Sequence, residues 1–168
     1  MGLDMYLYRR EYVGGWEWKT VDTDGREKAL YDNIIDYFGV DRVEASPHAY
    51  IDVVVAYWRK ANAVHGWFVN NLANGVDECQ SIPVTRQDLV DLREACESVL
   101  CVPTNVTGRL EDVVAEVGLQ PTPGFFFGSY DLDEWYMNDL ELTVKQIDAI
   151  LATVKETDWV DFIYQASW

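Results

Sequence analysis

GLDMYLYRREYV, residues 2–13, opens the chain with an alternation of apolar and other residues that is typical of a β-strand. One face of this strand carries Leu3, Met5 and Leu7. The other face carries Asp4, Tyr6 and Tyr8. WVDFIYQASW, which closes the chain at residues 159–168, alternates in the same way. We therefore predict a single α+β domain over residues 1–168, with a small, mostly antiparallel sheet in which the N- and C-terminal strands pair.

About four helices are expected between these two strands, at residues 26–38, 49–73, 85–100 and 132–155. The first is expected to turn Leu30, Ile34, Tyr37 and Phe38 inward. The second would begin near Ser46 and Pro47. The third would be capped by Thr85 with Asp88, and the fourth by Asp131 with Glu134. The buried stripe of the third would be Leu89, Leu92, Ala95, Cys96 and Val99.

Shorter elements are expected in the connections. Gly14-Gly15 suits a hairpin turn into WEWKTV. Residues 79–85 read as a short strand, which Pro83 would place at an edge of the sheet. FFFGS, residues 125–129, reads as a short buried strand. Residues 102–124 are expected to form an excursion from the main domain, with a short helix in GRLEDVVAEVG.

Composition limits the classes of function. Of the 168 residues, 49% are apolar, which excludes a disordered chain. The formal net charge of −16 argues against direct binding of nucleic acid through its phosphates and against an anionic membrane surface. It is compatible with an acidic protein that imitates nucleic acid toward a basic partner. The three cysteines suggest reduced thiols, and their spacing does not suggest zinc.

YWRKANAVHGWFV, residues 57–69, carries polar groups on an expected helix that is apolar on most sides. Two interpretations stay open. In the first, Arg59, Asn62 and His65 are satisfied core groups, with Asp4 as the partner of Arg59 and a loop carbonyl as the partner of Asn62. In the second, they line a pocket in which Arg59 meets an anionic group and aromatic rings stack on the ligand.

The pocket interpretation places a small ligand between the helix at 57–67 and the loop at 125–136. Gly66 would allow a ligand or a backbone to approach closely. The candidate ligand-binding residues are Trp58, Arg59, Asn62, His65, Trp67, Ser129, Tyr130 and Trp135. No catalytic residue, metal site or cofactor is expected. Ser129 lacks the G-x-S-x-G context of a hydrolase nucleophile, and the acids at 131–134 suit the first turn of a helix.

Five stretches together resemble a family of small proteins from bacteriophage and prophage genomes. They are GLDMYLYRR, YWRKANAVHGWFV, GVDECQSIPVTRQDL, FFFGSYDLDEWY and FIYQASW. The similarity covers most of the chain, although residues 102–122 are longer than the usual pattern. The family supplies no catalytic residues to carry over. The resemblance implies a soluble protein in the cytoplasm of an infected or lysogenic bacterial host.

We therefore expect a non-enzymatic phage or prophage accessory protein that acts as an inhibitor or sequesterer. Its partner would be a small molecule, with a nucleotide-like ligand as one candidate, or a host protein. Two alternatives stay open: an acidic inhibitor that docks on a basic host protein, and a small hydrolase whose site is assembled in space around His65 or His48. No membrane partner is expected, and self-association is left open.

Overall fold

The computed structural model describes residues 2–14, 25–40, 48–103, 108–124, 126–155 and 160–168. Within them, four strands form one antiparallel sheet in the order β2-β1-β4-β3. The strands are β1 (Asp4–Val13), β2 (Ala49–Arg59), β3 (Ile82–Val84) and β4 (Asp161–Ser167). The α+β fold and the pairing of the N- and C-terminal strands are therefore confirmed. The expected hairpin into WEWKTV lies outside the described residues.

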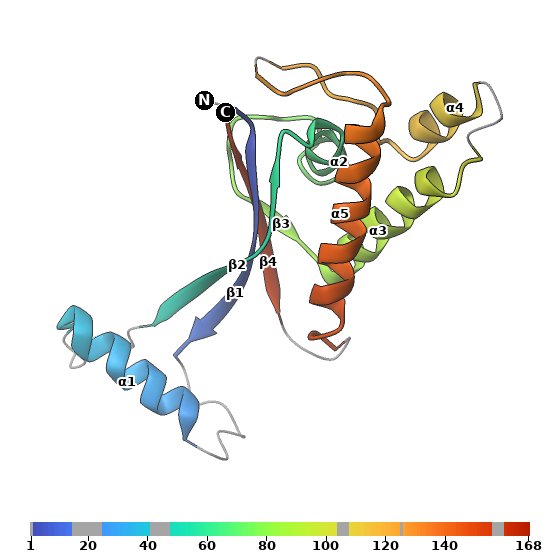
Figure 1. Ribbon diagram of the computed structural model, residues 1–168. Helices are drawn as coiled ribbons and strands as arrows, with labels where there is room; N and C mark the ends of the chain where they lie inside the picture. Colours follow the sequence, from blue (N-terminus) through green and yellow to red (C-terminus); the bar gives the residue numbers. More distant parts are fainter. Residues whose placement is uncertain (1, 15–24, 41–47, 104–107, 125, 156–159) are drawn as a thin grey trace.

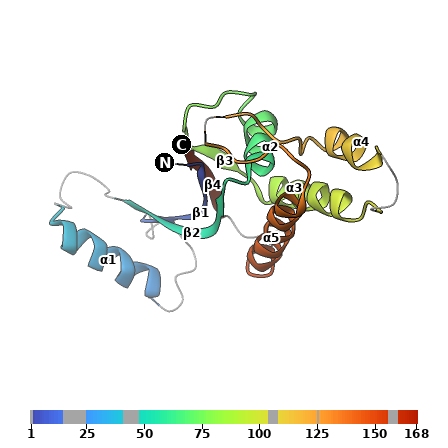
Figure 2. The same ribbon diagram turned by 45° about the horizontal axis from the view of Figure 1, so that its top comes forward.

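One face of the sheet is covered by helices (Figures 1 and 2). They are α2 (Asn62–Leu72), α3 (Arg86–Leu100) and α5 (Glu134–Leu151), with α4 (Arg109–Glu116) packed against α3. The sheet residues beneath them are fully or almost fully buried: Leu3, Met5 and Leu7 of the N-terminal segment and Phe162, Tyr164 and Ala166 of β4. Val114 of α4 and Leu119 after it belong to the same core.

The segment expected as one helix over 49–73 is a strand followed by a helix, so that prediction was wrong. β2 pairs with β1 along its whole length, from Ala49 opposite Val13 to Arg59 opposite Asp4. The chain then turns at Lys60, whose φ is 61°, and α2 begins at Asn62. Valine-rich β2 suits a strand because β-branched side chains pack well on a pleated surface. Ser46 and Pro47, expected to open the helix, lie outside the described residues.

The far part of β1 and β2 forms a two-stranded arm, since β4 pairs with β1 only as far as Arg10. Helix α1 (Arg26–Phe38) lies at the end of this arm, away from the other helices (Figure 1). It buries Tyr31 and Ile35 against Val13, with Ile34 at the margin. The bounds of this helix are as predicted. Its expected inward residues Leu30, Tyr37 and Phe38 are exposed, because a two-stranded arm covers only a narrow stripe of a helix.

The remaining local predictions divide between confirmed and wrong. The capping box of Thr85 with Asp88 and the buried stripe of α3 are confirmed, as is the edge position of β3 with Pro83. Helix α5 is capped by Asp133, whose side chain accepts from the amide of Tyr136. Asp131 was the wrong choice because it bonds with Ser129 instead. Of FFFGS, the described residues 126–129 do not form a strand: Phe126 has a φ of 70° and is exposed.

The face of the sheet opposite the helices carries rows of tyrosine on β1 and β2. They are Tyr6, Tyr8, Tyr12, Tyr50 and Tyr57, placed together by strand alternation and by the register of the two strands. The Tyr6 ring lies 5.2 Å from that of Tyr57, and the Arg10 guanidinium lies 5.2 Å from the centre of the Tyr50 ring. Reading residues 49–59 as a helix hid this arrangement. Within the described residues, no helix combines the length and apolar character needed to cross a membrane.

Gly66 allows a close approach between α2 and the segment after α4. A Cβ at Gly66 would collide with Oγ1 of Thr122 and would lie 3.2 Å from the Cβ of Thr122. We predict that Gly66→Ala lowers the free energy of unfolding by roughly 1–3 kcal/mol, as overpacking usually does. Chemical denaturation of Gly66→Ala, Thr122→Ala and the double variant would measure this. Thr122→Ala should recover part of the loss, and full additivity of the two changes would contradict the close contact.

Asp139 of α5 is a partly buried carboxyl. Burial, together with the nearby Asp133, raises its pKa from 3.8 to about 6. Because the folded state holds this proton more tightly, Asp139 stabilises the fold least at high pH, and its contribution falls as the pH rises from about 4 to 6. We predict that Asp139→Asn raises the free energy of unfolding by roughly 1–2 kcal/mol at pH 8 and by much less at pH 4. Equal gains at both pH values, measured by denaturation, would rule out this explanation.

Candidate functional site

The structure separates the residues that the sequence grouped on one helix. Trp58 lies on β2, is 1% exposed, and donates its indole N–H to Oγ1 of Thr143 at 2.9 Å. Arg59 lies at the end of the same strand, and its side chain is 61% exposed. Its Nη1 lies 3.8 Å from Oδ1 of Asp4, the partner that the core interpretation predicted. Arg59 is therefore a surface group rather than a buried one.

Asn62 and His65 are satisfied within the fold. Asn62 donates its side-chain amide to the carbonyls of Phe127 and Ser129, at 3.2 and 2.8 Å, which confirms the expected bond to a loop carbonyl. His65 is 1% exposed. Its Nε2 lies 3.0 Å from Asp77 and its Nδ1 lies 2.7 Å from the hydroxyl of Tyr164.

The partners of His65 indicate which of its ring nitrogens donates a hydrogen bond and which accepts one. Since a carboxylate only accepts, Nε2–H donates to Asp77, and in the neutral imidazole Nδ1 then accepts from the hydroxyl of Tyr164. Burial raises the pKa of Tyr164 well above its usual value, so its hydroxyl remains a donor. The ring of Phe127 also packs against the imidazole. These contacts give His65 the surroundings of a core histidine.

Of the loop residues predicted for the site, Ser129 and Tyr130 direct their side-chain hydrogen bonds to their own loop. Ser129 bonds with Asp131, and the hydroxyl of Tyr130 bonds with the backbone of Gly124. Tyr130 is 54% exposed and Trp135 is 77% exposed. The two segments that were predicted to meet do so through Asn62. The carbonyls of Phe127 and Ser129 already accept hydrogen bonds from the Asn62 amide.

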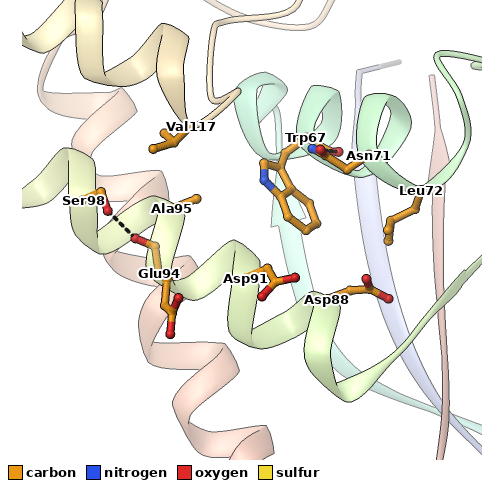
Figure 3. Close-up of a pocket in the computed structure, with 9 residues that line it drawn as sticks. All are labelled: Trp67, Asn71, Leu72, Asp88, Asp91, Glu94, Ala95, Ser98 and Val117. Atoms are coloured by element: carbon orange, nitrogen blue, oxygen red, sulfur yellow. Dashed lines mark hydrogen bonds between the residues drawn. The ribbon is translucent and has the colours of Figure 1, made fainter.

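Trp67, one of the predicted site residues, lines a pocket of about 550 Å³ (Figure 3). The volume is in the usual range for small-molecule sites. Helix α2 packs on α5 and β3, and α3 packs on α5 and α4, which leaves this space between α2 and α3. The described lining residues are Trp67, Asn71, Leu72, Asp88, Asp91, Glu94, Ala95, Ser98 and Val117.

Three acids of α3 give this pocket its charge. Asp88, Asp91 and Glu94 follow each other at intervals of three residues and so share one side of the helix. No Lys, Arg or His is among the described lining residues. In Figure 3 the side chains of Asp88 and Asp91 lie below the Trp67 ring, and Glu94 follows farther along α3 with its carboxylate turned away from the ring. The site therefore favours a positive charge.

The carboxylates keep free acceptor atoms. One oxygen of Asp88 accepts from Thr85, and one oxygen of Asp91 accepts from Gln87. Among the described residues, neither Asp91 nor Glu94 forms an ion pair. The nearby Arg93 is held by Asp148 and Glu97 instead. The acceptor capacity of this row is therefore available to a ligand.

Trp67 contributes an aromatic ring and a donor. The residue is 6% exposed, and its indole N–H has no hydrogen-bond partner within the described part of the chain. There, the only sealed side-chain nitrogen or oxygen without a partner is Nε of Arg9, so the Trp67 nitrogen must open to solvent. In Figure 3 the ring reaches from α2 toward α3, with its nitrogen on the side of Ala95 and Val117. The donor thus points into the pocket.

The sequence contains one signal for this site, the spacing of the acids on α3. The interval of three in Asp88, Asp91 and Glu94 was legible, but a row of acids on an amphipathic helix usually forms its solvated face. What distinguishes this row is the Trp67 ring opposite it, which depends on how α2 and α3 pack. The described residues contain no group of three or more His, Cys, Asp or Glu placed to hold a metal ion.

A second pocket, of about 390 Å³, lies beside β3 and β4 and is lined in part by Arg10, Tyr50 and Asp161. Its arginine is already paired, because both oxygens of Asp52 accept from Arg10 at 2.7 Å. This pocket therefore offers fewer free polar groups than the one beside Trp67. Neither pocket is lined by Arg59, Asn62 or His65.

Comparison with protein-family models, with curated proteins and with solved structures gives no match for this chain. The interpretation of the site therefore rests on its own geometry.

His65 and Arg59 should differ sharply when replaced. We predict that His65→Ala lowers the free energy of unfolding by roughly 2–4 kcal/mol, because it leaves the Tyr164 hydroxyl buried without its partner and opens a cavity. Arg59→Ala should change it by less than about 1 kcal/mol, as expected for an exposed ion pair. Denaturant titration of both variants would measure this. Similar losses in the two would contradict the division into core and surface groups.

Proposed function

We propose that this protein works by binding rather than by turnover, and that the pocket between α2 and α3 receives a positively charged group. The observation that supports this most directly is the row of three carboxylates opposite an aromatic ring, with no basic residue among the described lining. A carboxylate accepts hydrogen bonds from ammonium and guanidinium groups, and a tryptophan ring attracts cations placed over its face.

The charge distribution of the whole chain supports the same polarity. Residues 61–168, which hold α2 to α5, carry 18 Asp and Glu against 5 Lys and Arg, a net charge of −13. Residues 1–60 carry 11 against 8, a net charge of −3. A field of this sign raises the local concentration of cations and speeds their association. The pocket therefore lies in the more acidic part of the molecule.

The proposal keeps the ligand binding expected from the sequence but reverses the sign of the ligand. The expected anion was to meet Arg59, which lies on the surface beside Asp4 and outside both described pockets. The resemblance to phage and prophage proteins would place this binding in a bacterial host cell, where holding a cationic host component would suit an inhibitor or sequesterer.

The alternative of a small hydrolase receives less support from the geometry. His65 meets a carboxylate and a hydroxyl, as such a site would require, but both ring nitrogens are bonded and the side chain is 1% exposed. A catalytic base must reach the proton that it removes, either directly or through one water. The uneven charge favours the other alternative, an acidic inhibitor of a basic protein, because a protein also presents ammonium and guanidinium groups.

Replacing acids of the row should weaken cation binding. With 1,5-diaminopentane and arginine amide as probes at low salt, we predict that Glu94→Gln raises Kd about threefold and that the double change Asp91→Asn with Glu94→Gln raises it roughly tenfold. Isothermal titration calorimetry would measure both, and added salt should weaken binding. Glu141→Gln, an exposed acid of α5 outside the pocket, is the matched control and should leave Kd unchanged. The proposal fails if neither probe binds or if Glu141→Gln has the same effect as Glu94→Gln.

A further inference from the structure

The indole N–H of Trp67 is a free donor, so a well-matched ligand needs a hydrogen-bond acceptor in addition to its positive charge. Trp67 is 6% exposed, and its unpaired indole N–H lies on the side of the pocket-lining residues Ala95 and Val117. A ligand that closes the pocket without accepting this bond would leave the donor unpaired, which costs free energy. Ammonium and guanidinium groups have only donors, so they cannot meet it themselves. The preferred ligand must therefore carry an acceptor as well as a cation.

Asn71, on the same side of the pocket, offers a free acceptor, so a well-matched ligand also carries a hydrogen-bond donor there. Its amide nitrogen donates to the carbonyl of Trp67 at 2.8 Å, which fixes the side chain and leaves its amide oxygen as an acceptor. Trp67 and Asn71 thus present one donor and one acceptor from consecutive turns of α2. The group in a protein that matches such a pair is the peptide unit, with its own C=O and N–H.

The row on α3 suits a chain with more than one cation. A helix rises 1.5 Å per residue, so the row from Asp88 to Glu94 extends over about 9 Å of the α3 axis. One ammonium group cannot contact all three carboxylates. In an extended peptide, alternate side chains point the same way at intervals of roughly 6.5–7 Å. Two basic side chains of such a segment would reach both ends of the row.

We propose that the natural occupant of this pocket is an extended basic segment of another protein. Its Lys or Arg side chains would lie along Asp88, Asp91 and Glu94, and a peptide unit would bond with Trp67 and Asn71. This inference rests on the proposed cation binding and adds the class of the partner. The net charge of −13 carried by residues 61–168 supplies the complementary charge for a basic protein. A polyamine matches the charge of the row but has no acceptor for Trp67.

Two probes of equal charge separate these occupants. One is the peptide acetyl-Gly-Lys-Gly-Lys-Gly-amide, and the other is 1,5-diaminopentane. We expect the peptide to bind about three- to tenfold more tightly, the effect of one added hydrogen bond. In ¹H–¹⁵N NMR spectra of the whole protein, the peptide should move the indole N–H resonance of Trp67 downfield. The diamine should leave that resonance near its free position.

Two tryptophan variants separate the proposal of cation binding from the proposal of peptide binding. Trp67→Phe, which also assigns the resonance, should cancel the advantage of the peptide while the diamine still binds. Trp135→Phe, a change at an exposed tryptophan outside the pocket, is the matched control and should preserve the advantage. Since Trp67→Phe removes buried volume, its fold is checked by thermal unfolding, and the wild-type NMR result stands without it.

The outcomes that would overturn the inference are specific. If the diamine binds as tightly as the peptide and the Trp67 resonance responds to neither, the peptide inference is wrong and the cation proposal stands. If neither probe binds, or if binding is indifferent to the double change at Asp91 and Glu94, both are wrong. If the peptide binds more tightly but Trp135→Phe removes the advantage, the contact lies elsewhere and the inference is also wrong.

Discussion

β1 is the strand on which the rest of the structure depends, because it pairs along both edges with the two long neighbours β2 and β4, whereas β3 pairs with β4 only from Ile82 to Val84. β2 pairs with it from Asp4 to Val13, and β4 pairs with it from Asp4 to Arg10. Its buried side chains Met5 and Leu7 are 0% exposed. A slip of one residue in register would move these side chains to the open face and place tyrosines beneath the helices. The alternation in β1 therefore determines both its register and the face that receives α2, α3 and α5.

That alternation is also why the fold class could be predicted from the sequence while β2 could not. In β1 burial alternates from Asp4 to Tyr8, and in β4 it alternates along the whole strand, so these two strands could be predicted from their period of two. In β2 the run Val53-Val54-Val55 breaks the alternation, and the register shift between Leu7 and Tyr8 falls opposite it. A short apolar run fits a buried helix as well as a strand. The turn that separates β2 from α2 is made by Lys60 at a positive φ, a residue that signals no turn.

The candidate site was accessible to sequence reasoning only in part. Trp67 could be predicted as a candidate because it lies on a helix with many apolar faces, and that helix exists from Asn62 onward. Trp58 and Arg59 were predicted as site residues because the helix was expected to include them. They lie on β2 instead, where successive side chains point to opposite faces of the sheet. The acids of α3 were visible but had no partner in sequence that would distinguish them from a solvated face. Their meaning depends on the distance between two helices, which tertiary packing sets.

The buried polar groups of α2 acquire a function through that packing. Asn62 ties the start of the helix to the loop at 127–129, and His65 ties its middle to β4 and to Asp77. Gly66 admits Thr122 against the helix backbone. A helix held on several sides gives Trp67 little freedom to turn away from α3, so its donor remains aimed at the pocket before any ligand arrives. Binding then requires less ordering of the protein, which raises affinity for a partner that matches the fixed groups and lowers it for one that does not.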